Sequence, residues 1–397
     1  MIMDAISPSA IAPHLVAPRV RPELPFAWLH PRRYSAYSVA DATAIAIDGK
    51  LDEPAWEDLD EPAWEDVPFS EPFVDIMGPQ HWSQPWFSTR VKMRYNASHL
   101  FIGAYLEDSA VWAHETQRNV VVYHDNDFEV FVDAAGHTHN YVEIEVNALN
   151  TTWNLQLDRP YRDGGHENST RVDPRHGFDL VGKGFQSAVF TEGPPNDAAQ
   201  SLRYWTVEMA LPMRHLVENA SAPLPPKAGS FWRINFSRVQ WATRVRADGT
   251  YEKIPSRKED NWVWSPQYAV NMHMPEQWGY VFFSGQRPEK LFPLRPPPRD
   301  PNWPLPFLAF QVYHAQHAYR ASHGRFTAEW RRVKALLPVP EAAAHMSTTL
   351  TVPASGDRFD ADVCTLIATG AHACATVRSD GWYGHVRRRD GESLAVE

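Results

Sequence analysis

The sequence has no excess of positive charge. Its 397 residues include 38 Lys and Arg against 48 Asp and Glu, which gives a formal net charge of −10. Nucleic-acid binding requires a basic surface that neutralises phosphates, so this balance argues against a nucleic-acid partner. Acidic proteins of this kind usually meet neutral ligands or cations.

The sequence also lacks a long apolar run. No segment approaches the roughly eighteen apolar residues that a membrane helix needs, so no membrane span is expected. The N-terminal apolar segment is short, is broken by Pro8 and Pro13, and precedes its basic residues, unlike a signal peptide. We therefore leave the compartment open, with an extracellular location compatible with an incomplete N-terminus.

Cysteine and catalytic motifs are scarce. Cys364 and Cys374 are the two cysteines. A disulfide between them would close a loop worth on the order of 3 kcal/mol, and two free buried thiols are an equal alternative. The sequence contains no Gly-rich phosphate loop, nucleophile elbow or zinc signature. No motif therefore identifies an autonomous catalytic centre.

Aromatic and apolar residues are plentiful. Hydrophobic residues make up 43% of the chain, and it contains 16 Trp and 14 Tyr. This content is typical of a packed globular core. A buried Trp needs a partner for its N–H, so the surplus indicates some exposed aromatic platforms beside the core.

Short alternating segments dominate the chain between residues 42 and 284. The expected strands are 42–48, 89–96, 99–108, 126–133, 140–147, 151–157, 185–190, 204–211, 231–239 and 279–284. Such strands joined by turn-rich links predict a mainly β protein, an antiparallel, jelly-roll-like β-sandwich. One short helix is expected at 212–219.

Proline marks the expected domain boundaries. Residues 1–38 form a Pro-rich N-terminal tail, residues 39–284 the sandwich, and residues 285–305 a Pro-dense linker that excludes helix and central strand. Residues 306–397 predict a small α+β appendage. There, apolar residues at helical spacing precede a C-capping Gly324, and strand alternation follows.

Two neighbouring strands carry the most distinctive polar pattern. In 126–133 the apolar side chains point one way, while Asp127 and Glu129 point the other. In 140–147, Glu143 and Glu145 match the second face. Paired as a hairpin, these strands would build a face dense in carboxylates beside aromatic residues.

Three interpretations of this face compete. Paired carboxylates can hydrolyse glycosides, with Glu129 or Glu143 acting beside a second acid. Oxygen ligands at Asp125, Asp127 and Asp133 suit a calcium ion of structural function. An ordinary solvated sheet face is the third explanation. A ligand-binding face that uses side chains for hydrogen bonding fits the residue types better than catalysis.

The order of the motifs resembles a known family. IDGKLDEPAW, RVKMRYNASHLFIGAYLED, DFEVFVD with NYVEIEVN, YWTVEMALP, FWRINFSRV and WSPQYAVNMHMPEQWGYVFF follow one another between about 42 and 284. In this order they resemble the family 9 carbohydrate-binding modules. The resemblance implies a β-sandwich that binds an oligo- or polysaccharide, serves carbohydrate breakdown beside glycoside hydrolases, and holds structural calcium.

The resemblance also implies contact residues. The first of two aromatic residues that clamp a sugar ring falls on Tyr123. The acid of the EVF motif is Glu129, and a polar contact on the next strand falls on Asn147.

This chain departs from the family at two positions. A contacting Arg of the family is replaced by Glu145, and the second clamping aromatic by Met272. Met can pack against a sugar face but offers less than an indole ring. Trp112, Trp262 and Trp264 are therefore the candidates for the missing aromatic wall.

Two other functions stay open. One is a hydrolase acting on O-glycosyl bonds through Glu129 or Glu143. The other is a haem-binding redox module built on a related sandwich, suggested by His273 between two Met residues.

The phrase LDEPAWED occurs twice, at 51–58 and 59–66. The family pattern needs one copy, in which Pro starts a turn and Trp fills the sandwich edge. We predict that Trp64 takes the buried position and that the first copy bulges outward. In the alternative, the first copy keeps its register with Gly49 and the second bulges.

Deleting residues 51–58 should leave the thermal unfolding midpoint nearly unchanged. Doubling the length of a surface loop costs roughly 0.6 kcal/mol, so the extra copy should change the free energy of unfolding only slightly. A large drop in the midpoint, measured by circular dichroism, would show that both copies are structural.

Overall fold

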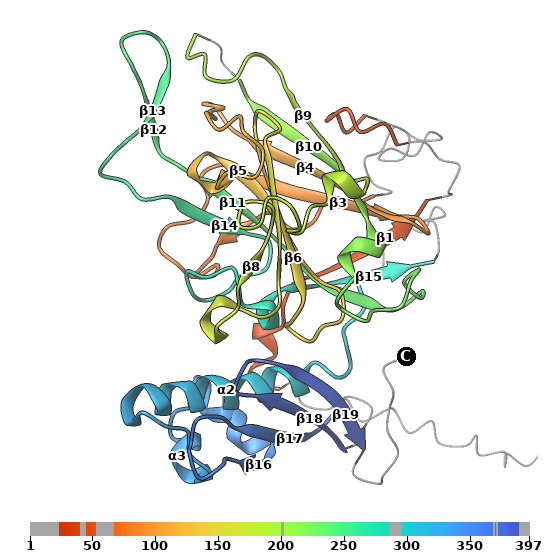
Figure 1. Ribbon diagram of the computed structural model, residues 1–397, viewed down its shortest axis with the longest axis vertical. Coiled ribbons are helices and arrows are strands. Elements are labelled where there is room, and N and C mark those ends of the chain that lie inside the picture. Colours follow the sequence, from red (N-terminus) through yellow and green to blue (C-terminus); the bar gives the residue numbers. More distant parts are fainter. Residues whose placement is uncertain are drawn as a thin grey trace, which may run out of the picture.

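The computed structural model describes residues 24–39, 45–52, 67–199, 202–285, 296–367, 370 and 372–388 (Figure 1). Most of the doubled phrase, with Trp56 and Trp64, lies outside the described residues. Leu51, which opens the first copy, is buried in a small cluster with Val39, Phe101 and Ala210.

The strands of the larger part, here called the sandwich, run in chain order. They are β1 (Arg33–Ser38), β2 (Val74–Asp75), β3 (Thr89–Tyr95), β4 (His99–Glu107), β5 (Asp127–Asp133), β6 (Tyr141–Asn147), β7 (Thr152–Leu157), β8 (Glu167–Asn168), β9 (Gln186–Thr191), β10 (Tyr204–Pro212), β11 (Phe231–Gln240), β12 (Thr243–Val245), β13 (Tyr251–Lys253), β14 (Asp260–Val263) and β15 (Gly279–Ser284). Its helical pieces are η1 (Ala27–Leu29), η2 (Val122–His124), η3 (Tyr161–Asp163), η4 (Val181–Lys183), α1 (Met213–Leu216) and η5 (Pro275–Gln277).

The main sheet follows the order β8-β7-β6-β5-β11-β15-β1-β3-β4-β10-β9, with β14 paired to β11 and β2. It curls so that side chains from β5, β6 and β11 meet those from β3, β4 and β10 in one core. The predicted mainly β, sandwich-like fold is confirmed. The sheet is mixed, however, because β1 is parallel to both β15 and β3.

Strand β1 lies in the segment where we expected an irregular, Pro-rich lead-in. Tyr34 and Ala36 of β1 are buried in the main core, and β1 joins the two halves of the sheet. The strand predicted at 42–48 is not observed in its described residues. Its first residues lie outside the described part of the chain, and residues 45–48 are not in a strand.

The core explains why the alternating segments became strands. Phe128 and Val130 of β5 pack with Ile234 of β11 and with Ile102 and Met209 from the other half of the sheet. All of these side chains are fully buried. Burying each large apolar side chain stabilises the fold by about 1.5–3 kcal/mol. Because side chains alternate between the two faces of a strand, every second residue of β5 and β6 lies in this core.

The opposite face of β5, β6 and β7 is covered as well. Phe131, Tyr141, Trp153, Leu155 and Trp278 form a second buried cluster there. Trp153, Leu155 and Leu157 alternate along β7, a pattern typical of core residues in a strand. They are buried, but on the carboxylate side of the sheet. This face is consequently not an ordinary solvated one.

The smaller part, here called the appendage, spans the described residues from 304 to 388. It consists of α2 (Pro304–His323), α3 (Trp330–Lys334), η6 (Pro340–His345), β16 (Ser347–Thr351), β17 (Asp360–Leu366), β18 (His372–Arg378) and β19 (Tyr383–Arg388). The strands form an antiparallel sheet in chain order, and α2 lies between this sheet and the sandwich (Figure 1).

Local chemistry sets the ends of α2. Pro304 is tolerated because the first helical turn needs no N–H at that position. The predicted C-cap, Gly324, ends the helix in the left-handed conformation at φ 70°. Cys364 and Cys374 are direct neighbours across β17 and β18 and form a disulfide. In the described part of the chain, no helix combines the length and apolarity needed to cross a bilayer.

Candidate functional site

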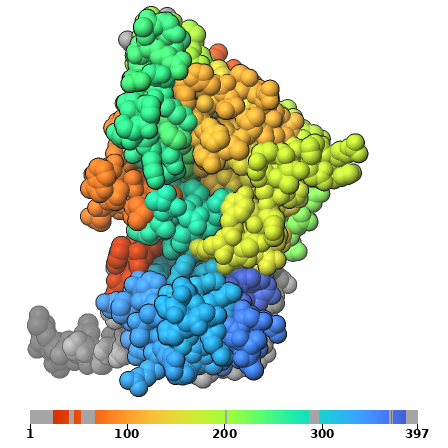
Figure 2. Space-filling model, turned by 60° about the vertical axis from the view of Figure 1, so that its left-hand side comes forward, coloured from red at the N-terminus to blue at the C-terminus, as the bar shows by residue number. Residues whose placement is uncertain are grey.

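A cavity of about 490 Å³ lies over β5, β6 and β7, on the face turned away from the main core. Figure 2 shows this side of the molecule, where the segments near residues 120, 165 and 270 border one another above the appendage. Its carboxylates are Glu129, Glu143, Glu145, Glu167 and Glu259. Its aromatic side chains are Tyr123, Phe131, Trp153 and Tyr161.

The floor of the cavity comes from the pairing of β5 with β6. Glu129 lies directly opposite Glu145, and Phe131 lies opposite Glu143. Carboxylate oxygens of Asp127, Glu129 and Glu145 lie within 4.8 Å of one another. All three side chains are at most 5% exposed. The predicted carboxylate face therefore exists, but its acids are buried instead of solvated.

Burial and mutual repulsion shift the protonation of this floor. Burial raises the pKa of Glu129 to about 7. Burial, followed by repulsion from Glu129, raises the pKa of Asp127, Glu143 and Glu145 well above the usual carboxyl range. Charged carboxylates in a low-dielectric site are unfavourable unless a cation or hydrogen-bond donors compensate them.

The basic side chains of the described lining do not supply that compensation. Arg171 forms an ion pair with Glu167 and stacks 5.3 Å from the Trp153 ring. Burial lowers the pKa of His273 to about 4, so its ring is neutral at pH 7. The His273 Nδ1 atom shares a 2.9 Å hydrogen bond with the Tyr141 hydroxyl.

Two tyrosines stand at the rim. Tyr123 in η2 is 41% exposed, and its backbone N–H donates to Glu145 Oε2 over 3.1 Å. Tyr161 in η3 is 43% exposed and packs edge-on against His273 with 4.6 Å between ring centres. Both rings combine exposed aromatic surface with a position beside the carboxylate floor.

Of the sugar contacts predicted from the sequence, Tyr123, Glu129 and Met272 line the cavity. Asn147 is fully buried, and its side-chain amide makes hydrogen bonds with neighbouring loop residues. Its Nδ2 donates to the Glu115 carbonyl and to Asp125, and its Oδ1 accepts the backbone N–H groups of residues 149 and 151. The structure thus places Asn147 as a loop organiser outside the lining.

None of the three candidate tryptophans lies in the lining of the cavity. Trp262 and Trp264 have no exposed surface and belong to the main core. Trp112 is 4% exposed, with Lys253 Nζ 5.4 Å from its ring. Trp262 in β14 and Trp264 just after it both point into the main core, which the sequence pattern alone did not indicate.

The aspartates proposed for calcium are not gathered at one point. Asp125 accepts the backbone N–H groups of His114 and Glu115. Asp133, at the far end of β5, accepts those of Gly136 and Thr138. Of the three, only Asp127 joins the carboxylate group of the cavity floor.

Several lining residues were not expected from the sequence. Tyr161, Glu167 and Arg171 come from a loop and a two-residue strand without periodicity. The turn residues of RPYRDGG indicated only a loop. The sequence therefore offered no signal that this loop folds over the carboxylate face.

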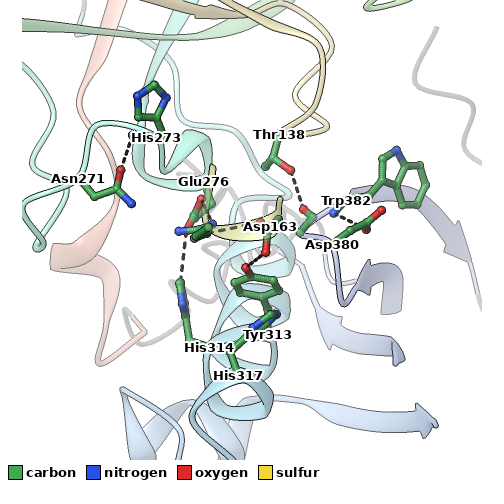
Figure 3. Close-up of polar contacts among 12 residues, drawn as sticks. Thr138, Asp163, Asn271, His273, Glu276, Tyr313, His314, His317, Asp380 and Trp382 are labelled. Atoms are coloured by element: carbon green, nitrogen blue, oxygen red, sulfur yellow. Dashed lines mark hydrogen bonds and ion pairs between the residues drawn. The ribbon is translucent and has the colours of Figure 1, made fainter. Parts of the chain in front are cut away.

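Helix α2 of the appendage makes polar contacts with η3 and η5, the segments beside the cavity (Figure 3). Arg162 Nη2 in η3 donates to both oxygens of Glu276 in η5, at 2.8 and 2.9 Å. His314 Nε2 of α2 lies 3.2 Å from Glu276, and the Tyr313 hydroxyl donates to Asp163. Because η3 carries Tyr161 and η5 follows His273, helix α2 holds both rim segments in place.

Comparison with known proteins gave only distant structural matches. No protein-family model matches the sequence, and no curated protein is similar to it. A candidate carbohydrate-binding protein from Bacteroides uniformis ATCC 8492 is 16% identical, with 64% of this chain and 100% of that chain covered and a TM-score of 0.45. A family 9 carbohydrate-binding module from Caldicellulosiruptor kristjanssonii, solved with cellotriose, is 12% identical over 67% and 100% of the chains, with a TM-score of 0.37. At these values the matches do not determine what this chain binds.

Replacing Glu276 with Gln should destabilise the junction of η3, η5 and α2. Burial alone would raise the pKa of Glu276, but Arg162 and His314 outweigh it and hold the pKa at about 2. The Glu276→Gln variant leaves a mostly buried guanidinium without its anion, so we expect a loss of about 3 kcal/mol in urea unfolding. Glu329→Gln, which breaks an exposed ion pair of the appendage, should have a much smaller effect. Equal losses in the two variants would contradict this interpretation.

The contribution of His317 to the free energy of unfolding should decrease as the pH falls from about 6.5 to 4. Burial lowers the pKa of His317 in α2 from 6.5 to about 4, and its Nε2 lies 3.0 Å from the Ser379 carbonyl. The neutral ring is favoured in the folded state, so its contribution is present above pH 6.5 and lost toward pH 4. For this half-buried group we expect about 1–2 kcal/mol.

His317→Gln should remove this contribution to the pH dependence, because an amide keeps a hydrogen bond to Ser379 and does not titrate. The matched control is His176→Gln, since the His176 side chain is 81% exposed. Urea unfolding at pH 7, 5.5 and 4.5 measures the slope. An unchanged slope in His317→Gln would refute the prediction.

Proposed function

We propose that this cavity binds a neutral carbohydrate, an oligo- or polysaccharide. The observation that carries the proposal is the combination of exposed tyrosine rings with a carboxylate floor in one hollow. Carboxylates accept hydrogen bonds from sugar hydroxyls, and aromatic faces pack against the C–H groups of a sugar ring. Few other ligands present many hydroxyl donors and a flat apolar face together.

The charge of the lining supports a ligand without negative charge. Five glutamates line the cavity, and the Arg171 guanidinium is already paired with Glu167. A phosphate or carboxylate ligand would meet repulsion in a partly desolvated site. A neutral polyol instead donates hydrogen bonds to acceptors that burial has left poorly solvated.

The dimensions of the site support a small saccharide segment. A volume of about 490 Å³ is within the range typical of small-molecule sites, and its walls mix apolar and polar groups in the usual way. Tyr123 and Tyr161 offer aromatic surface at the rim, and Met272 offers a flexible apolar one. The order of the sequence motifs resembles that of modules that accompany glycoside hydrolases, which supports a role in carbohydrate breakdown.

Tyr123→Ala should weaken saccharide binding roughly 2- to 10-fold, because one aromatic contact contributes about 0.5–1.5 kcal/mol beyond buried area. A glycan array of the full chain selects the ligand, and isothermal titration calorimetry measures the affinity. Tyr105→Ala is the matched control. Tyr105 lies on β4 in the other half of the sheet and packs on Tyr204, with ring centres 5.0 Å apart.

Two outcomes would contradict the proposal. One is an absence of neutral glycans among the bound ligands, and the other is equal affinity in wild type and Tyr123→Ala. The same samples are assayed for new reducing ends. Their release, lost in Glu129→Gln, would identify a glycoside hydrolase instead.

A further inference from the structure

The cavity floor contains a set of acidic oxygens with the spacing of a metal site. Asp127 and Glu129 come from β5, and Glu145 comes from the facing position of β6. Their carboxylate oxygens lie within 4.8 Å of one another. Oxygens bound to one Ca²⁺ lie about 2.3–2.6 Å from it, so two of them are at most about 5 Å apart. The backbone pairing alone therefore brings the three oxygens within the reach of one ion.

A second observation lies outside these three side chains. Glu143 is 5% exposed and lines the same cavity, and its Oε2 has no hydrogen-bond partner among the described residues, with His273 Nε2 3.9 Å away. Within the trio, Asp127 Oδ1 accepts the Val239 N–H, while its buried Oδ2 also has no partner. A buried acceptor without a partner costs about 1–3 kcal/mol, and more when it is charged. These oxygens are placed to be satisfied by something that the cavity admits.

Two basic side chains near the floor form ion pairs with other acids. Arg238, which lies near enough to feel the Asp127 charge, is fully buried and pairs with Asp108 over 3.0 Å. Arg171 is paired with Glu167 at the rim. These described side chains therefore do not compensate a charged floor, and a cation from solution that displaces the protons of its acids would do so.

We propose that Asp127, Glu129 and Glu145 bind a calcium ion, which in turn coordinates hydroxyl groups of the saccharide. The donor set is all oxygen, which favours hard cations over zinc or copper. Calcium accepts six to eight ligands in flexible geometry, whereas magnesium demands a near-ideal octahedron and retains its water. Three side chains leave coordination positions that point into the cavity, where two hydroxyls of a sugar fit. This inference rests on the proposed carbohydrate binding for its second half only.

The test starts from full-length protein that has been stripped with EDTA and dialysed. Titration with CaCl₂ in a calorimeter should reveal one site with a Kd no weaker than about 1 mM, and calcium should raise the unfolding temperature. Glu145→Gln should weaken calcium binding at least ten-fold, while the amide oxygen can still accept the Tyr123 N–H. Glu329→Gln is the control, because Glu329 is an exposed carboxylate of the appendage that does not line the cavity.

Terbium provides a second readout if Glu145→Gln folds poorly. TbCl₃ bound to the wild-type floor should show emission sensitised by Trp153, and added CaCl₂ should quench it. The absence of a calcium heat, a thermal shift and sensitised terbium emission at about 10 mM metal would overturn the site. Equal calcium binding in wild type and folded Glu145→Gln would also overturn it.

Titration of oligosaccharides with and without calcium separates this inference from the proposed function. Binding that needs calcium supports both. Binding that is unchanged by EDTA keeps the proposed function and overturns the coordinating role of the ion. Calcium binding without any saccharide affinity supports the cation site and contradicts the proposed function.

Discussion

The pairing of β5 with β6 is the constraint on which the site depends. Opposite residues alternate between the main core and the cavity, with Val130 facing Ile144 on one side and Glu129 facing Glu145 on the other. A slip of one residue would exchange the two faces and bury carboxylates in an apolar core. The apolar set therefore fixes the register, and the fixed register brings the acids together.

Such a concentration of buried acid needs support from the rest of the molecule. Loops containing η2 and η5 cover the edges of the carboxylate face and contribute Tyr123, Met272 and His273. Their apolar neighbours, including Phe131 and Trp278, form a separate buried cluster around the floor. The stabilisation of this cluster offsets part of the unfavourable desolvation of the acids. A large sandwich can offset the unfavourable free energy of these buried acids, whereas the net stability of a smaller domain is too low to do so.

The sequence predicted the parts of the structure that depend on periodicity. The strands expected at 89–96, 126–133 and 140–147 agree with β3, β5 and β6 within one residue at each end. The polar face of β5 and β6 followed from the same alternation. The residues brought over this face by loops could not be predicted, because a loop has no period. Trp262 and Trp264 are instructive, since aromatic content suggested ligand contact while tertiary packing directed both rings into the core.

The appendage is part of the architecture that shapes the cavity. Tyr280 and Phe282 of β15 share one buried cluster with Phe310 and Tyr313 of α2, so the two parts have a continuous apolar interface. Polar contacts then set its orientation, with the Thr138 hydroxyl donating to the Gly381 carbonyl over 2.6 Å beside the β5–β6 turn. The contact from α2 reaches Glu276, which follows His273 of the cavity wall by three residues. Removing α2 would expose apolar surface on β15 and release the segments that bear Tyr161 and His273. The appendage therefore positions the segments that line the site, although none of its described side chains lines the cavity itself.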